Sequence, residues 1–346
     1  GLVLAQIDGL WTFYSAESIG GGPPSSIIYG LLAQESRLWV TTSSGIGVFD
    51  GHEWQSYAVG DSALDGQAAA DWPFEWPGVM PPMAQVEQGD LLGLWVGTPY
   101  GIAVRQSDGS WAAFPQNDDL PRPTVTALLP ARDGTVWIGT QAGLARWDGH
   151  SLVDVDPPAL GSSYYLALAE DASGGIWAGT VADGLQYLDG EEWICFTGES
   201  DSVPRTSACK HLLPGYSTLV SGLESDGAAG MWVGTFSGLA HFVGDEPQPL
   251  PPELAEATGE QEVITFWRDE TSGDLWIGLR SDVLVVTAQG IERPVGAGIV
   301  SMDTVRAITG DAEGSIWLGT NDGLWRYRRA WEPLRPDGRT VPPGSG

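Results

Sequence analysis

The sequence is poor in the residues on which phosphate-binding sites depend. A single lysine, Lys210, accompanies fifteen arginines, and the formal net charge of the 346 residues is −29. Such a surface repels phosphate groups, which excludes nucleic acid and anionic lipid as expected partners and favours a protein partner or a neutral or cationic ligand. The simpler interpretation is that the acidity serves solubility and selects no ligand. No run of eighteen apolar residues occurs, so no membrane-spanning helix is expected.

Histidine and cysteine are also scarce, with four and two residues respectively. No Cys/His spacing typical of a metal site occurs, so we expect no cofactor. A calcium ion in an acidic loop is an alternative, and residues 61–65 and 118–119 are the places for it, although neither segment resembles an EF-hand loop. The histidines do not form a cluster in the sequence: His52 and His150 follow Asp-Gly turns, His241 lies in a predicted strand, and His211 lies in an insertion.

What the chain does contain is a pentapeptide led by tryptophan that recurs seven times. The tryptophans are Trp39, Trp95, Trp137, Trp177, Trp232, Trp276 and Trp317. Their spacing of roughly forty residues is typical of a four-stranded propeller blade. The sequence therefore predicts one seven-bladed β-propeller of antiparallel blades, in which these tryptophans pack between neighbouring blades and the glycine that usually follows lets two backbones approach closely.

The third repeat shows the strand pattern most completely. Apolar and alternating runs predict strands A (124–129), B (135–140), C (144–147) and D (151–155), ordered from the central channel to the rim. Asp-Gly pairs separate the strands because glycine reaches positive φ without steric cost. Strand A is predicted in the other repeats at 27–32, within 83–92, 164–169, 218–223, 263–267 and 304–308.

The two ends of the chain are predicted to close the ring. Residues 7–14 repeat the C–D turn and D strand of residues 49–57, so we expect residues 10–14 to form the outer strand of the last blade and to complete residues 304–328. In the alternative arrangement residues 330–334 take that position. Residues 1–6 read as a strand or as the end of a secretory signal. Residues 1–334 are then one domain, and 335–346 a Pro/Gly-rich tail or linker.

The pattern Asp-x-x-Gly-x-Ile-Trp-x-Gly-Thr followed by Gly-Leu, as in Asp311–Trp325 and Asp171–Gly190, resembles the two-component regulator propeller repeat. The resemblance extends over nearly the whole chain. It implies an extracytoplasmic sensor-type domain located in the periplasm, at the cell surface or outside the cell. Individual repeats depart from the pattern; Thr41, for example, replaces the usual glycine.

Two insertions interrupt the repeats, at 60–85 and 198–217, and both connect a D strand to the next A strand. D–A and B–C loops emerge on the same face of a propeller, which makes this face the candidate for function. Trp72, Phe74 and Trp76 alternate with prolines in the first insertion and present apolar area for a partner or a sugar. The alternative is that these rings cap the channel.

The B–C loops add candidate binding residues to this face: Tyr100, Gln141, Phe236, Arg280 and Asn321. A mixture of aromatic and amide side chains suits a carbohydrate or a peptide better than a phosphate. We therefore predict a non-catalytic recognition module. The alternatives are a lyase or glycan-active hydrolase, for which a carboxyl such as Glu75 or Asp201 could serve as general acid, and a structural subunit of a surface assembly.

Cys195 and Cys209 are separated by thirteen residues, with Cys195 at the end of a D strand and Cys209 in the second insertion. A disulfide between them would close a fifteen-residue ring and would stabilise the fold by about 3 kcal/mol. The alternative is a pair of reduced cysteines buried as small apolar residues.

Overall fold

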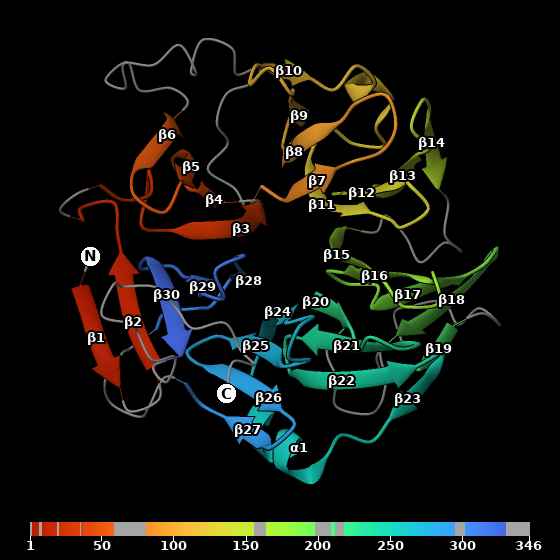
Figure 1. Ribbon diagram of the computed structural model, residues 1–346. Coiled ribbons are helices and arrows are strands. Elements are labelled where there is room, and N and C mark those ends of the chain that lie inside the picture. Colours follow the sequence, from red (N-terminus) through yellow and green to blue (C-terminus); the bar gives the residue numbers. More distant parts are fainter. Residues whose placement is uncertain are drawn as a thin grey trace.

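The computed structural model describes residues 2–6, 9–18, 21–34, 36–58, 81–155, 164–197, 209–211, 218–294 and 302–329. Seven sheets stand around a central axis, each built from four antiparallel strands, which confirms the predicted seven-bladed propeller (Figure 1). The only α-helix in this part of the chain is α1 (Pro252–Thr258), in the D–A connection between blades 5 and 6. It is too short to cross a membrane, and none of the described residues form a helix that could.

The first three blades each contain four strands. Blade 1 consists of β3 (Ile28–Gln34), β4 (Arg37–Thr42), β5 (Gly45–Phe49) and β6 (Trp54–Ala58); blade 2 of β7 (Met83–Val86), β8 (Gly93–Thr98), β9 (Gly101–Arg105) and β10 (Trp111–Ala113); blade 3 of β11 (Val125–Pro130), β12 (Val136–Thr140), β13 (Gly143–Trp147) and β14 (Leu152–Val155).

The remaining blades keep this order, and two of them gain a fifth strand. Blade 4 consists of β15 (Tyr165–Glu170), β16 (Ile176–Thr180), β17 (Leu185–Asp189), β18 (Glu192–Thr197) and β19 (Cys209–His211); blade 5 of β20 (Val220–Ser225), β21 (Gly230–Thr235), β22 (Gly238–Val243) and β23 (Glu246–Gln248); blade 6 of β24 (Val263–Arg268), β25 (Leu275–Leu279), β26 (Val283–Thr287) and β27 (Gly290–Glu292); blade 7 of β28 (Ala307–Gly310), β29 (Ile316–Gly319), β30 (Leu324–Arg329), β2 (Gly9–Tyr14) and β1 (Leu2–Gln6).

Most predicted A strands match the observed ones to within two residues. The largest difference is in blade 7, where β28 begins at Ala307 rather than at residue 304. Thr304 has a φ of 38°, outside the extended region, so the strand cannot begin there. In blade 2 the predicted weak strand is the four-residue β7.

Asp-Gly turns join strands C and D as predicted. In the turn at Asp50, the carboxylate Oδ1 accepts hydrogen bonds from the backbone N–H groups of His52 and Glu53 at 2.9 and 2.8 Å. Gly51, which follows Asp50, has a φ of 95°, which residues with an L side chain rarely adopt. The aspartate therefore organises the loop, and the glycine makes its backbone path possible.

Neighbouring blades approach most closely where strand B carries a glycine. A Cβ built on Gly319 would lie 2.5 Å from the Ile28 Cγ2 of the next blade, so no larger residue fits. Blade 1 has Thr41 at this position, and its hydroxyl donates to the Pro81 carbonyl of blade 2 at 3.1 Å. In blade 1, a hydrogen bond from Thr41 to the next blade thus replaces the close apolar packing that the glycine allows in other blades.

Two other blade interfaces, between blades 3 and 4 and between blades 5 and 6, contain a similar hydrogen bond whose donor lies on strand A. The Thr126 hydroxyl donates to the Tyr165 carbonyl at 2.6 Å, and the Ser221 hydroxyl donates to the Val263 carbonyl at 2.6 Å. Each donor stands where the register of its strand shifts by one residue. These bulges direct a side chain at the neighbouring blade and fix the inner ends of the blades against one another.

The repeated tryptophans form the core between the blades, as predicted. Six of the seven are 4% exposed or less, whereas Trp232 of blade 5 is half-buried. Trp177 packs against Phe242 of the next blade with ring centroids 5.8 Å apart, and Trp276 packs against Tyr327 at 5.6 Å. The apolar side chains are therefore divided among clusters between adjacent blades.

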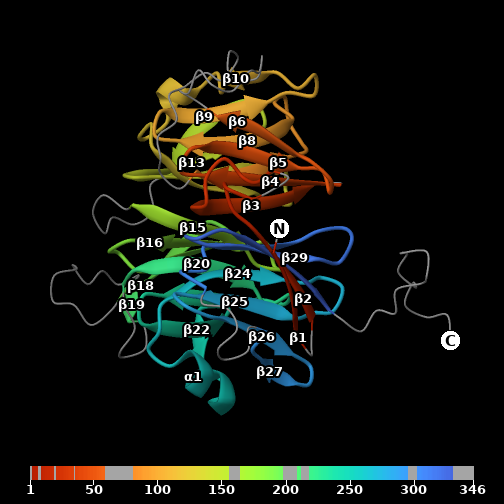
Figure 2. The same cartoon turned by 90° about the vertical axis from the view of Figure 1, so that its left-hand side faces the viewer.

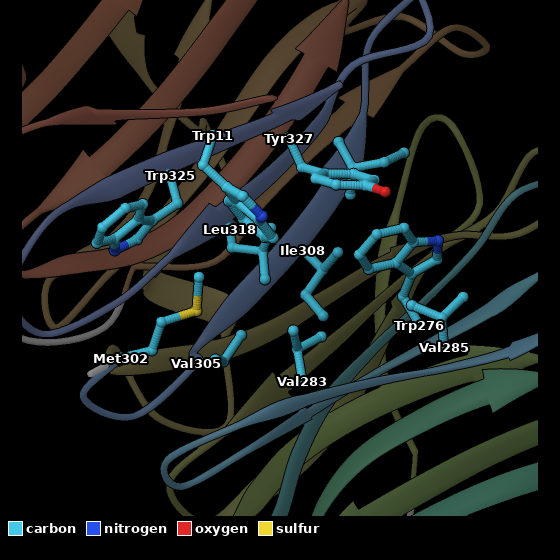
Figure 3. Close-up of a cluster of buried hydrophobic side chains, with 11 residues drawn as sticks. Trp11, Trp276, Val283, Val285, Met302, Val305, Ile308, Leu318, Trp325 and Tyr327 are labelled. Atoms are coloured by element: carbon cyan, nitrogen blue, oxygen red, sulfur yellow. The ribbon is translucent and has the colours of Figure 1, made fainter. Parts of the chain in front are cut away.

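The N-terminal strand β2 closes the ring. It pairs antiparallel with β30, with Trp11 opposite Tyr327, which confirms the predicted closure of the last blade by residues from both ends. β1 adds a fifth strand outside β2, so residues 2–6 form a strand. Figure 3 shows Trp11 among side chains of blades 6 and 7, including Trp325 and Tyr327. The predicted tail at 335–346 and the alternative strand at 330–334 lie outside the described residues.

Candidate functional site

The B–C loops are held by the threonine that ends strand B. The Thr98 hydroxyl donates to the Gly101 carbonyl at 2.8 Å and accepts from the Tyr100 N–H at 3.1 Å. Thr235 makes the same two contacts with Gly238 and Ser237. Because the hydroxyl fixes the short loop from inside, the residue at its tip points outward. The side chains of Tyr100 and Phe236 are 49% and 51% exposed as a result.

Phe236 and Arg280 are the predicted binding residues that the structure brings together. The guanidinium of Arg280 in blade 6 lies 6.0 Å from the centre of the Phe236 ring in blade 5. It also pairs with the Glu262 carboxylate at 2.5 Å. The Glu262 carboxylate therefore holds the Arg280 guanidinium beside the exposed Phe236 ring. The Phe236–Arg280 pair joins blades 5 and 6.

Asn321 serves the fold as well as the surface. Its Oδ1 accepts a hydrogen bond from Arg306 Nε at 2.6 Å, and its Nδ2 donates to Asp303 Oδ2 at 3.3 Å. Arg306 in turn lies 5.7 Å from the centre of the Tyr29 ring of blade 1. Gln141 is exposed at its loop tip. Trp72, Phe74 and Trp76, together with nearly all of the first insertion, lie outside the described residues.

The second insertion contributes an unexpected strand. β19 pairs parallel with the outer strand β18, and the register places Cys209 opposite Cys195. Cys195 is 1% exposed, and no cysteine of the described residues is a free thiol. This register supports the predicted disulfide and shows how the insertion is attached to the edge of blade 4.

We expect Cys209→Ala to lower the free energy of unfolding by about 3 kcal/mol because the unfolded chain loses a covalent loop. Urea unfolding of the variant and of wild type, each with and without reductant, measures this loss. Reductant should destabilise only the wild type. If two thiols per chain can be labelled in denatured wild-type protein without reductant, the disulfide is absent.

The opposite mouth of the channel, where the A–B turns lie, contains a cavity of about 570 Å³. The repeat pattern of the sequence does not indicate this cavity. Its walls come from the ends of four A strands, β11, β15, β20 and β24, in blades 3 to 6. The lining includes Leu129, Leu168, Leu223, Glu224 and Arg268. Apolar and charged side chains therefore meet in one concave space.

Glu224 is the unusual residue of this cavity. It stands opposite Trp232 in the register of blade 5, where blades 3 and 4 have Leu129 and Ala169 opposite their tryptophans. Burial raises the pKa of the Glu224 carboxyl to about 7; the charge of Arg268 opposes the rise and that of Glu270 adds to it. An acidic residue at a position that is apolar in neighbouring repeats is the signal by which the sequence could have indicated it.

This pKa predicts a specific dependence of stability on pH. Glu224 binds its proton more tightly in the folded protein than in the unfolded chain, so its contribution to stability falls as pH rises from about 4.5 to about 7. Glu224→Gln replaces the carboxyl by an amide of similar shape that stays neutral at all these pH values. We therefore expect the urea midpoint of Glu224→Gln to rise relative to that of wild type as the pH increases across this range. A difference that does not change with pH would contradict the assignment.

The histidines of the described residues are dispersed. His52 and His150 lie in C–D turns; His150 Nδ1 is 2.6 Å from Asp90 Oδ2, which raises the pKa of the imidazole. His241 Nε2 is 3.0 Å from Asp226 Oδ2, and its ring stacks on Trp232. Among the described residues, no group of three His, Cys, Asp or Glu side chains could hold a metal ion. Segment 61–65 lies outside them, and residues 118–119 end a short 3-10 helix.

Comparisons with known proteins agree with the fold. Residues 119–142 match the family Two component regulator propeller. No curated protein sequence matches the chain. The fold is similar to an extracellular domain from B. thetaiotaomicron assigned to the hybrid two component system BT3049, with a TM-score of 0.67 and 18% identity over 88% of this chain. This chain spans 40% of the length of that protein.

Two other solved structures have the same fold and different roles. Virginiamycin B lyase from Staphylococcus aureus has a TM-score of 0.61 and 12% identity over 92% of this chain and 97% of the lyase. PorZ, a surface component of the type-IX secretion system of Porphyromonas gingivalis, has a TM-score of 0.63 and 14% identity over 93% of this chain and 49% of PorZ. At these identities the likenesses show the fold alone. The chain is thus a seven-bladed β-propeller that carries a two-component regulator propeller repeat.

Proposed function

We propose that this protein is a non-catalytic, extracytoplasmic recognition domain of the sensor type, which binds a protein partner or a small or glycan ligand through its D–A and B–C loop face. The exposed Phe236 ring, backed by the Arg280 guanidinium, carries the proposal. Aromatic and arginine side chains supply most of the binding energy in many interfaces. Aromatic rings bury a large area and lose little conformational freedom.

Two further observations support a role in recognition. The extracellular domain of a hybrid two component system of B. thetaiotaomicron shares the fold, and one repeat matches the two component regulator propeller family. From the connectivity of the D–A loop we expect the first insertion to bring Trp72, Phe74 and Trp76 to the same face. The acidic surface favours a neutral or basic partner over an anionic one.

Native mass spectrometry of the protein purified from its own source under gentle conditions tests this proposal. We expect a defined complex that is lost when residues 66–80 are deleted, and weakened when Phe236 and Arg280 are both replaced by alanine. Leu92→Ala is the matched control because Leu92 is equally exposed, at 52%, in the A–B connection on the opposite face. A bare monomer from the wild type, with no binding to an array of neutral oligosaccharides, would refute the proposal.

The non-catalytic part has its own test, because a lyase shares the fold. Incubation with a streptogramin B antibiotic, followed by mass spectrometry, should leave the antibiotic intact. Linear product formed at a rate proportional to protein concentration, and lost on replacing a histidine, would overturn this part. The recognition part would still be decided by the complex described above.

A further inference from the structure

The cavity at the A–B mouth of the channel has the construction of a binding site. Its volume of about 570 Å³ is in the range of small-molecule pockets, and its walls are mainly the ends of paired strands, with Arg132, Gly227 and Glu270 added by the A–B turns. β15 and β20 lie next to each other at the centre of the ring, between β11 and β24 (Figure 1). Figure 2 shows the same blades stacked edge-on. Side chains on such elements are held in place before a ligand arrives.

Two opposite charges line this cavity, the Glu224 carboxyl and the Arg268 guanidinium, and both are half-buried. They attract each other, since the charge of Arg268 opposes the rise of the Glu224 pKa, but no hydrogen bond or close ion pair joins either group to a described residue. The guanidinium lies over Gly227, where a Cβ would be 2.2 Å from Arg268 Nη1. A half-buried charge without a hydrogen-bonded partner is costly, and a ligand that bonds to both groups would remove part of that cost.

Two other charged groups of the cavity, Glu170 and Arg132, have hydrogen-bond partners. Glu170 accepts a hydrogen bond from the Arg132 N–H at 2.8 Å, and the Arg132 guanidinium donates to the Asp171 carbonyl at 2.9 Å. These two residues are therefore occupied by each other and by the backbone. Glu270 is exposed at the rim and adds negative charge on the Glu224 side.

An apolar wall completes the cavity. Leu129, Leu168 and Leu223 come from three successive A strands and line the same space as the two charges. All three are half-buried, so they retain apolar surface that a ligand could cover. The cavity therefore offers a half-buried anion, Glu224, a half-buried cation, Arg268, and an aliphatic surface, with Glu270 exposed at its rim.

We propose that this cavity binds a small zwitterion with an aliphatic side chain, namely a free α-amino acid or a dipeptide. The ligand ammonium binds the Glu224 carboxylate, its carboxylate binds the Arg268 guanidinium, and its side chain packs on the three leucines. The pKa of Glu224 near 7 supports this arrangement, because an ammonium ion favours the ionised carboxylate and ligand binding would release a proton below that pH. This site is distinct from the loop face of the proposed function.

Isothermal titration calorimetry at pH 7.5 with L-leucine and L-leucyl-L-leucine tests the proposal. We expect binding of at least one of them, and at least about tenfold weaker binding of leucinamide, which lacks the carboxylate, and of 4-methylpentanoate, which lacks the ammonium. These four probes need only the wild-type protein. No detectable binding of either zwitterion, or equal affinity for the zwitterion and either analogue, would overturn it.

Variants locate the site and separate it from the loop face. Glu224→Gln and Arg268→Gln should each weaken binding of the zwitterion at least about tenfold, while Phe236→Ala should leave it unchanged. Urea unfolding confirms that each variant is folded. Conversely, Glu224→Gln should keep the complex seen by native mass spectrometry. Loss of zwitterion binding in Phe236→Ala, or full binding in both cavity variants, would refute the assignment of the site to this cavity.

Discussion

Replacing Trp11 by alanine is expected to lower the free energy of unfolding by about 3–5 kcal/mol, the range for removing a large buried aromatic side chain. Trp11 is 1% exposed, and its ring centre lies 4.8 Å from that of Tyr327 and 6.2 Å from that of Trp325. The substitution opens a cavity where the N-terminal strand joins the last blade. Urea unfolding monitored by circular dichroism measures the loss.

Trp193→Ala is the matched control for this prediction. Trp193 also lies on a D strand, in blade 4, and packs against Trp137 at 6.4 Å, but it is only half-buried and does not join the two ends of the chain. Its replacement should cost less than that of Trp11. If both variants lose the same stability, or if Trp11→Ala stays within about 1 kcal/mol of wild type, β2 does not close the ring as described.

Replacing Asp171 by alanine is expected to cost at least about 3 kcal/mol, because each buried donor left without an acceptor costs about 1–3 kcal/mol. Asp171 is fully buried. Its carboxylate accepts from the N–H groups of Ser173 and Gly175 at 2.8 and 3.0 Å, and from Trp177 Nε1 at 2.9 Å. The change therefore disrupts the A–B turn and the core tryptophan together, and denaturant unfolding reports the sum.

Asp133→Ala supplies the comparison for Asp171→Ala. Asp133 lies in the equivalent turn of blade 3, where its carboxylate accepts from the N–H and the hydroxyl of Thr135. It is exposed, so water can replace it, and we expect a loss below about 1 kcal/mol. Similar losses in the two variants would mean that the bond to the tryptophan contributes little.

The position of Asp171 illustrates how much of the fold the sequence predicts. Asp171 and Asp311 both precede a tryptophan by six residues, and in both blades the carboxylate accepts a hydrogen bond from the indole. Asp226 has the same spacing from Trp232, yet its carboxylate pairs with His241. The difference depends on the residue that strand C places across the sheet, which spacing along the chain does not reveal.

Of the two candidate sites, the sequence predicts the loop-tip residues but not the cavity. Phe236 and Arg280 were predicted because each occupies a loop tip that the repeat defines, and loop tips can be read from the sequence one repeat at a time. The cavity was not predicted, because Leu129, Glu224 and Arg268 belong to different blades and are far apart in the sequence. Only closure of the ring brings the ends of their strands to one mouth.

The sequence by itself determined the number of blades, the strand order within each blade and the use of the N-terminal strand in closing the last one. Hydrophobic alternation, Asp-Gly turns and the repeated tryptophans are local signals, and each blade follows from about forty residues of chain. The tertiary structure alone decided that Thr41 bonds to Pro81, that β19 joins blade 4 and that Glu224 faces a cavity with Arg268. These depend on contacts between segments distant in sequence, and such contacts are fixed by the packing of blades around the axis.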